Sequence, residues 1–107
     1  MAYVYQTEFD IRHEQMNLLE IGAALERALG YLRTLLPSET GYITARAMYS
    51  LTHDEYTHII FQSEWDYWED LENHRLHSYL DEDKLLVHFQ PHVDLANLTT
   101  HIYSEIP

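Results

Sequence analysis

The stretch YITARAMYSLTHDEYTHIIFQSEW, from Tyr42 to Trp65, decides the fold. It contains two runs rich in β-branched and aromatic residues, Tyr42–Ser50 and Tyr56–Trp65. The short polar link LTHDE separates them. Two such runs joined by a short link predict two antiparallel strands that form a hairpin.

The expected register pairs Tyr49 with Thr57, so that Ala47 meets Ile59 and side chains alternate between two faces. One face is then apolar and carries Ile43, Ala45, Ala47, Tyr49, Ile59, Phe61 and Trp65. The reverse face is mixed, and it carries Tyr42, Thr44, Arg46, Met48, His58, Ile60, Gln62 and Glu64. We expect Arg46 to pair with Glu8 or Glu64 across this reverse face.

A strand and a long helix precede the hairpin. Residues Ala2–Asp10 alternate between apolar and polar side chains, which predicts a half-buried strand. The period then changes to three- and four-residue steps, which is typical of a helix with one apolar face. This helix is expected to begin near His13 and to stop before Pro37. Its apolar face is expected to hold Leu18, Ile21, Gly22, Leu25, Ala28, Leu29, Leu32, Leu35 and Leu36.

A second helix and a last strand follow the hairpin. Asp66 resembles an N-cap and predicts a helix from Tyr67 to about Tyr79. A shorter helical piece is expected around Lys84–Phe89, and a strand over Leu98–Ile106. The predicted order is therefore β-α-β-β-α-β, which is typical of a ferredoxin-like α+β fold.

This order predicts one domain over residues 1–107, with two helices on one face of a four-stranded antiparallel sheet. Two helices on one side leave the mixed face without cover. A second copy packed against that face would cover it, so the chain is expected to form a homodimer with itself.

Composition excludes several classes of function. Six Lys and Arg residues against eighteen Asp and Glu residues give a net charge of −12, which disfavours nucleic-acid and anionic-membrane partners. Cysteine is absent, so disulfides and thiolate chemistry are excluded. The N-terminus lacks the pattern of a signal peptide and no apolar run is long enough to span a bilayer, so a cytoplasmic location is expected.

The segment GYITARAMYSLTHDEYTHIIFQSEWDYWEDLENHRLH resembles the dimeric α+β barrel superfamily, in particular its antibiotic biosynthesis monooxygenase-like group. The matching features are a strand led by Gly41, a following strand ending in Trp65, and a helix bearing His74. The resemblance implies a pocket between the sheet and its two helices. Some relatives use such a pocket to oxidise aromatic, quinone-forming substrates with molecular oxygen and no cofactor. Others degrade haem, isomerise lactones or have no known activity.

The resemblance singles out a few candidate site residues. His74 is the candidate catalytic residue, either as a general base or as a donor that stabilises an anion, because its unperturbed pKa of about 6.5 suits either role near neutral pH. The alternative is a partly buried helix histidine bonded to a neighbour. Trp65 is either a wall that stacks on a planar ligand or a core residue that closes the strand–helix corner. Tyr5, Tyr49 and Tyr79 are possible phenol donors to a substrate oxygen.

Metal and haem chemistry are not expected. His74 with His77, and His88 with His92, have the spacing of helix-borne metal ligands, but Pro91 interrupts the second pair. The first pair lacks an evident third ligand. The Asn, Trp and His on which haem-degrading relatives depend have no counterparts at the corresponding positions of this sequence.

The leading hypothesis is a cofactor-independent monooxygenase, an oxidoreductase acting on a small aromatic or polyketide-like substrate. The first alternative is a non-catalytic dimeric module that binds a small ligand or is purely structural. The second alternative is an isomerase on the same scaffold.

Overall fold

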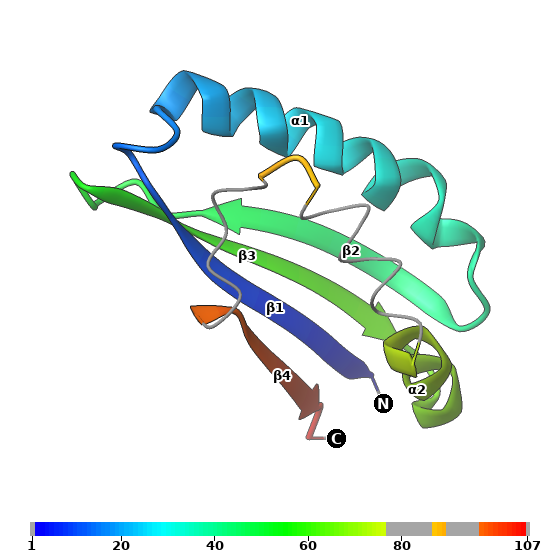
Figure 1. The fold of residues 1–107 in the computed structure, drawn as a ribbon. Coiled ribbons are helices and arrows are strands. Elements are labelled where there is room, and N and C mark those ends of the chain that lie inside the picture. The colour runs from blue at the N-terminus through cyan, green and yellow to red at the C-terminus, as the bar shows by residue number, and fades with distance from the viewer. Residues whose placement is uncertain (1, 77–86, 90–96, 107) are drawn as a thin grey trace.

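The chain folds in the predicted order, and the computed structural model describes residues 2–76, 87–89 and 97–106. Figure 1 shows the elements, which are β1 (Tyr3–Arg12), α1 (Leu18–Thr34), the 3-10 turn η1 (Leu36–Ser38), β2 (Tyr42–Tyr49), β3 (Tyr56–Trp65), α2 (Trp68–Leu76) and β4 (Thr99–Ser104). No helix among these described residues is long and apolar enough to cross a membrane.

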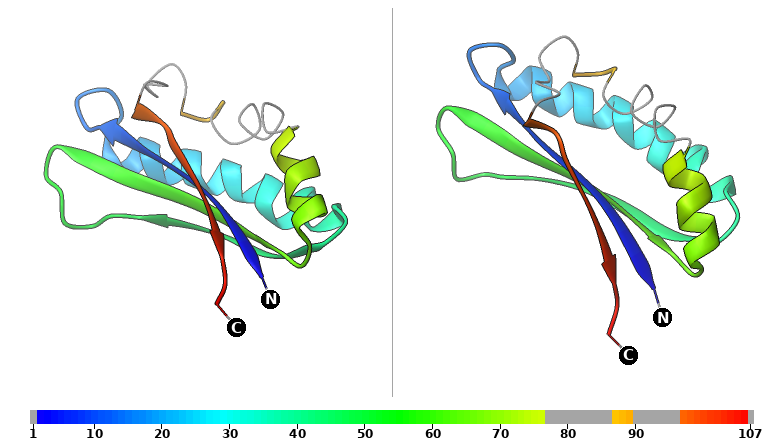
Figure 2. Two further views of the ribbon diagram at one scale, coloured as in Figure 1. Left: turned by 90° about the horizontal axis from the view of Figure 1, so that it is seen from below. Right: turned by 60° about the horizontal axis from the view of Figure 1, so that its bottom comes forward.

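The four strands form one sheet in the order β2-β3-β1-β4, with every neighbouring pair antiparallel. Both helices lie on the same face of this sheet, as the views in Figures 1 and 2 agree. The predicted ferredoxin-like α+β architecture is therefore confirmed.

The predicted register of the hairpin is wrong by two residues. Tyr49 pairs with Ile59, and Ala47 pairs with Phe61. A shift of two preserves the alternation of faces, because the side-chain period of a strand is two. Ala45 and Ala47 therefore still lie on the helix-covered face, next to different neighbours from those expected.

An irregularity at the start of β2 overturns the predicted faces of Tyr42 and Ile43. The register shifts between Tyr42 and Thr44, so that Tyr42 pairs with Trp65 and Thr44 with Glu64. Tyr42 consequently packs against the core, whereas the side chain of Ile43 is 42% exposed. An extra residue in one strand reverses the alternation locally, which a regular two-residue pattern cannot anticipate.

Helix α1 begins later than predicted because of a capping box. The Asn17 side chain accepts a hydrogen bond from the backbone N–H of Glu20 at 2.8 Å, and the Glu20 carboxylate accepts one from the backbone N–H of Asn17 at 3.3 Å. This reciprocal pair satisfies two of the N–H groups that the first turn of a helix leaves free. The segment from His13 to Met16 is thus a turn before the helix.

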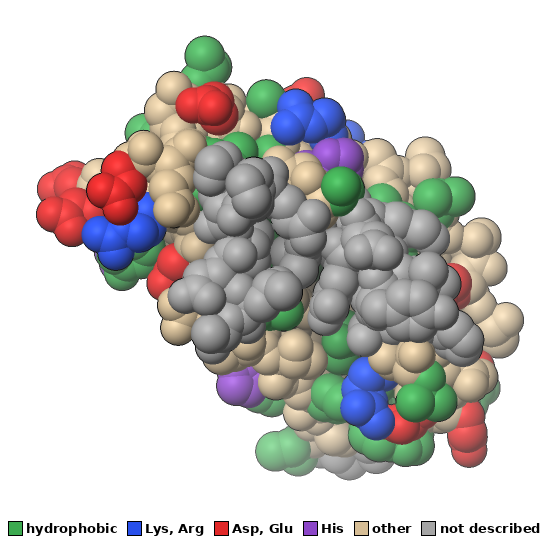
Figure 3. Space-filling view, in the orientation of Figure 1, with side chains coloured by type: hydrophobic (Ala, Val, Ile, Leu, Met, Phe, Trp, Pro, Cys, Tyr) green, Lys and Arg blue, Asp and Glu red, His purple; other side chains and the backbone are tan. Residues whose placement is uncertain are grey.

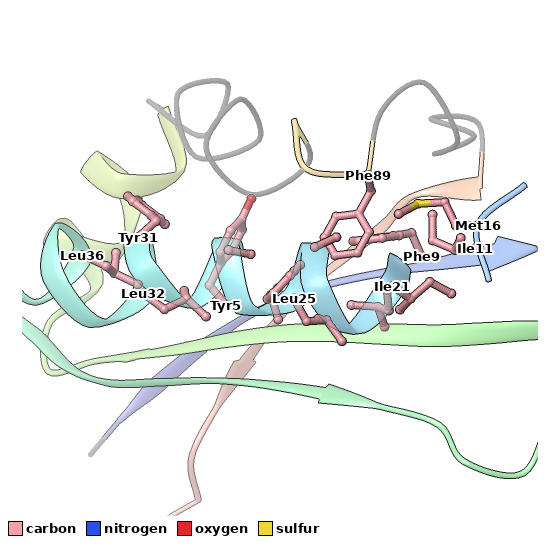
Figure 4. Packing of buried hydrophobic residues seen from close by; sticks show 14 of the residues in the cluster. Tyr5, Phe9, Ile11, Met16, Ile21, Leu25, Tyr31, Leu32, Leu36 and Phe89 are labelled. Carbon is pink, nitrogen blue, oxygen red and sulfur yellow. The ribbon is translucent and has the colours of Figure 1, made fainter. Parts of the chain in front are cut away.

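The buried face of α1 agrees in part with the predicted one. Leu18 and Leu35, expected on the apolar face, are 65% and 54% exposed. The helix buries Ile21, Leu25, Ala28 and Leu32 as predicted, together with Ala24 and Tyr31. Figure 4 shows several of these side chains directed from α1 toward the strands.

Three phenylalanines join the centre of the core. Phe9 from β1 lies tilted against Phe61 from β3, with ring centroids 6.0 Å apart. Phe89 is fully buried and meets Phe9 edge to face at 5.3 Å, as Figure 4 illustrates. Aromatic pairs in this geometry contribute about 0.5–1.5 kcal/mol beyond their buried area. The turn at residues 87–89 is therefore anchored to the sheet by one side chain.

The remaining boundaries lie close to those predicted. Helix α2 begins at Trp68, one residue later than expected, and its extension to Tyr79 lies outside the described residues. Of the expected helical piece Lys84–Phe89, the described residues 87–89 form a turn. The last strand is shorter than predicted and occupies Thr99–Ser104.

The sheet face opposite the helices carries a polar network. His58 lies between two carboxylates, with Nδ1 2.6 Å from Asp10 Oδ1 and Nε2 3.2 Å from Glu8 Oε1. Burial alone would lower the pKa of His58, but hydrogen bonds to Asp10 and Glu8 and the charges of both carboxylates outweigh it and raise that pKa above 6.5. His101 Nε2 lies 3.4 Å from the second oxygen of Glu8.

Arg46 does not form the predicted ion pair with Glu8 or Glu64. Its Nε donates to Gln62 Oε1 at 2.7 Å, and the Gln62 amide in turn donates to Gln6. The two glutamines lie directly across the β1–β3 pair from each other, which brings their side chains together. Arg46 thus joins a row of neutral amides on the open face.

Candidate functional site

Trp65 and His74, the two principal candidates, lie together at one end of the sheet. Trp65 closes β3 and is fully buried, and His74 on α2 is 5% exposed. Their ring centroids are 4.6 Å apart at an interplanar angle of 33°. The Trp65 indole N–H donates to Ser63 Oγ at 2.9 Å, so its buried polar group is satisfied.

Glu39 contacts the imidazole from the turn that precedes β2. His74 Nδ1 lies 3.3 Å from Glu39 Oε1. An ionised carboxylate can only accept a hydrogen bond, so Nδ1 carries the proton in this pair. Glu39 is itself held in place, because its backbone N–H donates to Leu36 and its carbonyl accepts from Tyr42. A buried histidine is thereby fixed in one tautomer by a carboxylate that is 39% exposed.

Two tyrosines complete an aromatic cluster around this pair. Tyr5 on β1 is 9% exposed and meets the His74 ring edge to face, with centroids 5.6 Å apart. Tyr42 meets Trp65 edge to face at 6.2 Å. Tyr5, predicted as a phenol donor, therefore lies at the site. Tyr42 also lies there, although it was not among the predicted site residues.

The other two predicted tyrosines are not brought to this cluster by the described structure. Tyr49 is 55% exposed and pairs with Ile59, whereas Trp65 pairs with Tyr42 at the other end of the hairpin. Six residues of extended strand separate Ile59 from Trp65, which corresponds to roughly 20 Å. Tyr79 lies outside the described residues.

The turn that carries Glu39 is clasped to the start of α2. Gly41 has a φ of +82°, and a Cβ at this position would overlap the Asp70 side chain. The backbone N–H of Asp66 also donates to the Gly41 carbonyl at 3.0 Å. Only glycine fits such a close approach in the left-handed region. The clasp fixes the distance between Glu39 and His74 by joining the two elements that carry them.

A groove lies next to the cluster, between α1 and the edge strand β2. It has a volume of about 460 Å³ and is lined by residues that include Leu29, Leu32, Arg33 and Tyr42. A smaller hollow of about 270 Å³ lies beside His13 and Glu55 near the far end of the sheet. Neither is lined by Trp65 or His74, so the groove reaches the cluster only through Tyr42.

Sequence reasoning missed Glu39, Tyr42 and Arg33. Glu39 lies 35 residues before His74, and no local pattern links the two. Tyr42 was assigned to the wrong face because of the irregularity in β2. Arg33 occupies an ordinary helix surface position. The groove that Arg33 lines forms only when β2 packs beside α1. The combination of a turn, Gly41 and a preceding acid is the one signal that could have drawn attention to Glu39.

The described residues offer no group of three His, Cys, Asp or Glu side chains arranged to hold a metal ion. His77 and His92, partners in the two histidine pairs of the sequence, lie outside those residues. The described side chains of the cluster offer an imidazole, a carboxylate and phenol groups.

Solved structures similar to this chain share its fold but little of its sequence. A dimeric protein of unknown function with a ferredoxin-like fold from Bacteroides fragilis matches with a TM-score of 0.71 at 12% identity, over 97% of this chain and 96% of that chain. A candidate antibiotic biosynthesis monooxygenase from Nitrosomonas europaea matches with a TM-score of 0.65 at 14% identity, over 98% of this chain and 90% of that chain.

A further candidate antibiotic biosynthesis monooxygenase, from Deinococcus radiodurans, matches with a TM-score of 0.65 at 13% identity, over 100% of this chain and 94% of that chain. No family model matches the chain, and no curated protein matches it by sequence. These similarities confirm the predicted ferredoxin-like fold, which by itself does not fix an activity.

Proposed function

We propose that the protein is a cofactor-independent monooxygenase of small aromatic or polyketide-like substrates, with His74 as the general base. The observation that carries the proposal is the environment of His74. It is a buried imidazole with a carboxylate at Nδ1 and an indole against its ring. The carboxylate leaves Nε2 as the nitrogen that can accept a proton. The fold that this chain shares with candidate antibiotic biosynthesis monooxygenases supports the same conclusion.

The proposed reaction requires a substrate with a CH₂ group whose C–H bond is made acidic by conjugation to a carbonyl through a fused aromatic system. His74 Nε2 removes one proton from a ring CH₂ group, and the resulting carbanion transfers an electron to molecular oxygen. A carbon–oxygen bond then forms and the oxygen–oxygen bond breaks. The CH₂ group becomes a carbonyl, and the second oxygen atom leaves as water. The substrate supplies all four electrons that the oxygen accepts.

The neighbouring aromatic residues have supporting roles in this proposal. Trp65 forms a wall against which a planar substrate packs, and Tyr5 donates a hydrogen bond to the enolate oxygen that develops. Both residues contact the His74 ring. Tyr79 remains a proposed second phenol donor, and Tyr49 would act only on a part of a ligand remote from His74.

Oxygen uptake with a panel of anthrones and hydroquinones tests the proposal. Loss of a general base is expected to slow the reaction by about 10²–10⁴-fold, so His74→Ala should lose nearly all activity. His53→Ala is the matched control, because His53 stacks on Tyr56 in the β2–β3 link and lies far from the cluster. Equal rates for both variants and the wild type would remove His74 from the mechanism.

We also infer that the chain acts as a homodimer joined through its open sheet face. The similar protein from Bacteroides fragilis is dimeric. Here the helices leave that face bare, and Met48 and Tyr103 are exposed on it at 37% and 49%. Covering a half-apolar sheet face is the usual way to stabilise such an open sheet. A sedimentation mass near that of one 12.8 kDa chain at micromolar concentration would refute the dimer.

A non-catalytic ligand-binding module is the second candidate. The observation that favours it is the burial of Trp65, Leu71 and His74, which are all at most 5% exposed. Such close packing is typical of a structural role for these side chains. Binding of an aromatic ligand without any oxygen uptake across the panel would favour this candidate over the enzyme.

A further inference from the structure

The groove between α1 and β2 exists because the edge strand carries small side chains where the helix crosses it. Ala45 and Ala47 lie on the helix-covered face of β2 and are only partly buried. Larger residues at these two positions would fill the space under α1. The groove left behind has a volume of about 460 Å³, within the range of about 300–1,000 Å³ typical of small-molecule sites.

The lining of this groove is apolar on two sides and aromatic at one end. Leu29 and Leu32 from α1 face Ala45 and Ala47 from β2 across it. Tyr42 closes the end nearest Trp65. Aliphatic walls with one aromatic ring suit a flat or elongated apolar body.

Arg33 places a positive charge beside these apolar walls. Among the described residues, Arg12 pairs with Glu14 and Arg75 pairs with Glu72, but no carboxylate pairs with Arg33. The chain has eighteen acidic residues and only six basic ones, so a positive charge in the lining of a groove is a local exception on this surface. Arg46 also lines the groove, but its side chain lies on the open face of the sheet, where it bonds to the neutral Gln62. Arg33 therefore gives the groove its positive charge on an acidic protein, whose acidic side chains (red) are visible in Figure 3.

We propose that this groove binds a small organic anion, with an aromatic or aliphatic body between α1 and β2 and a carboxylate at Arg33. A guanidinium matches a carboxylate in geometry as well as in charge. The inference goes beyond the proposed function, because neither Trp65 nor His74 lines the groove. Ligand binding to the groove is measured without any reaction. A negative result there can therefore be distinguished from a negative result in the oxygen-uptake assay.

The test uses a pair of ligands that differ only in charge. 2-Naphthoate and the neutral 2-naphthamide are titrated into the full-length, ¹⁵N-labelled protein, and amide shifts are followed by NMR. Naphthoate is expected to shift the amides of Ala45 and Ala47 and to bind about two- to five-fold more tightly than the amide, because an exposed ion pair contributes roughly 0.4–1 kcal/mol. Arg33→Gln should remove that difference while leaving naphthamide binding unchanged.

Arg27→Gln is the matched control, because it removes the same charge from the same helix outside the groove. It should leave the preference for naphthoate intact. Equal affinities for the two ligands in the wild type would overturn the proposal. So would equal losses in the two arginine variants, or shifts confined to the open sheet face. An absence of binding at millimolar ligand would also reject it.

Discussion

Gly41 is subject to two constraints at once, a φ of +82° and the side chain of Asp70 where a Cβ would lie. We expect Gly41→Ala to lower the free energy of unfolding by at least about 1 kcal/mol, because an L-residue in the left-handed region costs roughly 1–2 kcal/mol before any overlap is counted. Urea denaturation followed by circular dichroism measures the change.

Gly22→Ala provides the control for this prediction. Gly22 lies within α1, and a Cβ there meets nothing within 4 Å. Alanine in an exposed helix is favoured over glycine, so this variant should gain roughly 0.5–1 kcal/mol. If both substitutions changed stability in the same direction, the clasp between Gly41 and Asp70 would not be a determinant of the fold.

The contact between Glu39 and His74 makes a prediction that does not depend on activity. The ¹⁵N shifts of the His74 ring should show the proton on Nδ1 in the wild type and in Glu39→Gln, because the amide oxygen can still accept it. Glu39→Leu removes the acceptor, and the preference for this tautomer should weaken or disappear. Glu26→Leu, on the exposed side of α1, should leave the ring signals unchanged.

Retention of the Nδ1–H tautomer in Glu39→Leu would show that another group fixes the ring. His74 and Trp65 could be proposed from sequence because they stand at the positions on which the family resemblance rests, the end of β3 and the helix that follows it. Glu39 could not, since its contact with His74 forms only after β2 and α2 pack together through Gly41. The sequence thus indicates which side chains could take part in proton transfer or binding, whereas tertiary packing determines which of them are in contact.

The start of α1 carries the prediction at the scale of an element. Asn17→Ala removes the side-chain acceptor for the backbone N–H of Glu20 and should cost about 1 kcal/mol of stability. Glu20→Gln should cost little, because glutamine can also complete a capping box. The midpoints of urea unfolding measure both. A loss in Glu20→Gln as large as that in Asn17→Ala would mean that the carboxylate acts through its charge on the helix.

Element order could be predicted from this sequence because alternation and helical periodicity are local properties. The two misplaced features are not local. The hairpin register depends on how six-residue loops close and on which side chains α1 covers, so Tyr49 could be paired wrongly with Thr57 without violating any alternation. The irregularity at Tyr42 is likewise dictated by the packing of its ring against Trp65.

Two histidines give the whole molecule opposing responses to pH. The raised pKa of His58 means that the folded state binds this proton more tightly than the unfolded chain does. Its contribution to stability is therefore complete below about pH 6.5 and is lost as the pH rises through the raised value. Burial and the charge of Arg27 lower the pKa of His88, so titration of His88 destabilises the fold as the pH falls below about 6.5.

The contribution of His58 is measured by urea unfolding of the wild type and of His58→Gln. The two proteins are compared between pH 5 and 9 at one protein concentration. The stability difference between them should be largest at the acidic end and should shrink as the pH rises. A difference that grew with pH would mean that the carboxylates of Glu8 and Asp10 do not stabilise a charged imidazole.

The packing of His74 on Trp65 also gives the molecule an optical property. The chain has two tryptophans, of which Trp65 is fully buried and Trp68 is 44% exposed. In a Trp68→Phe variant all indole emission comes from a single fluorophore whose ring lies 4.6 Å from an imidazole. A protonated imidazole quenches a neighbouring indole, whereas a neutral one does so far less. The brightness of this variant therefore reports directly on the protonation state of the candidate base.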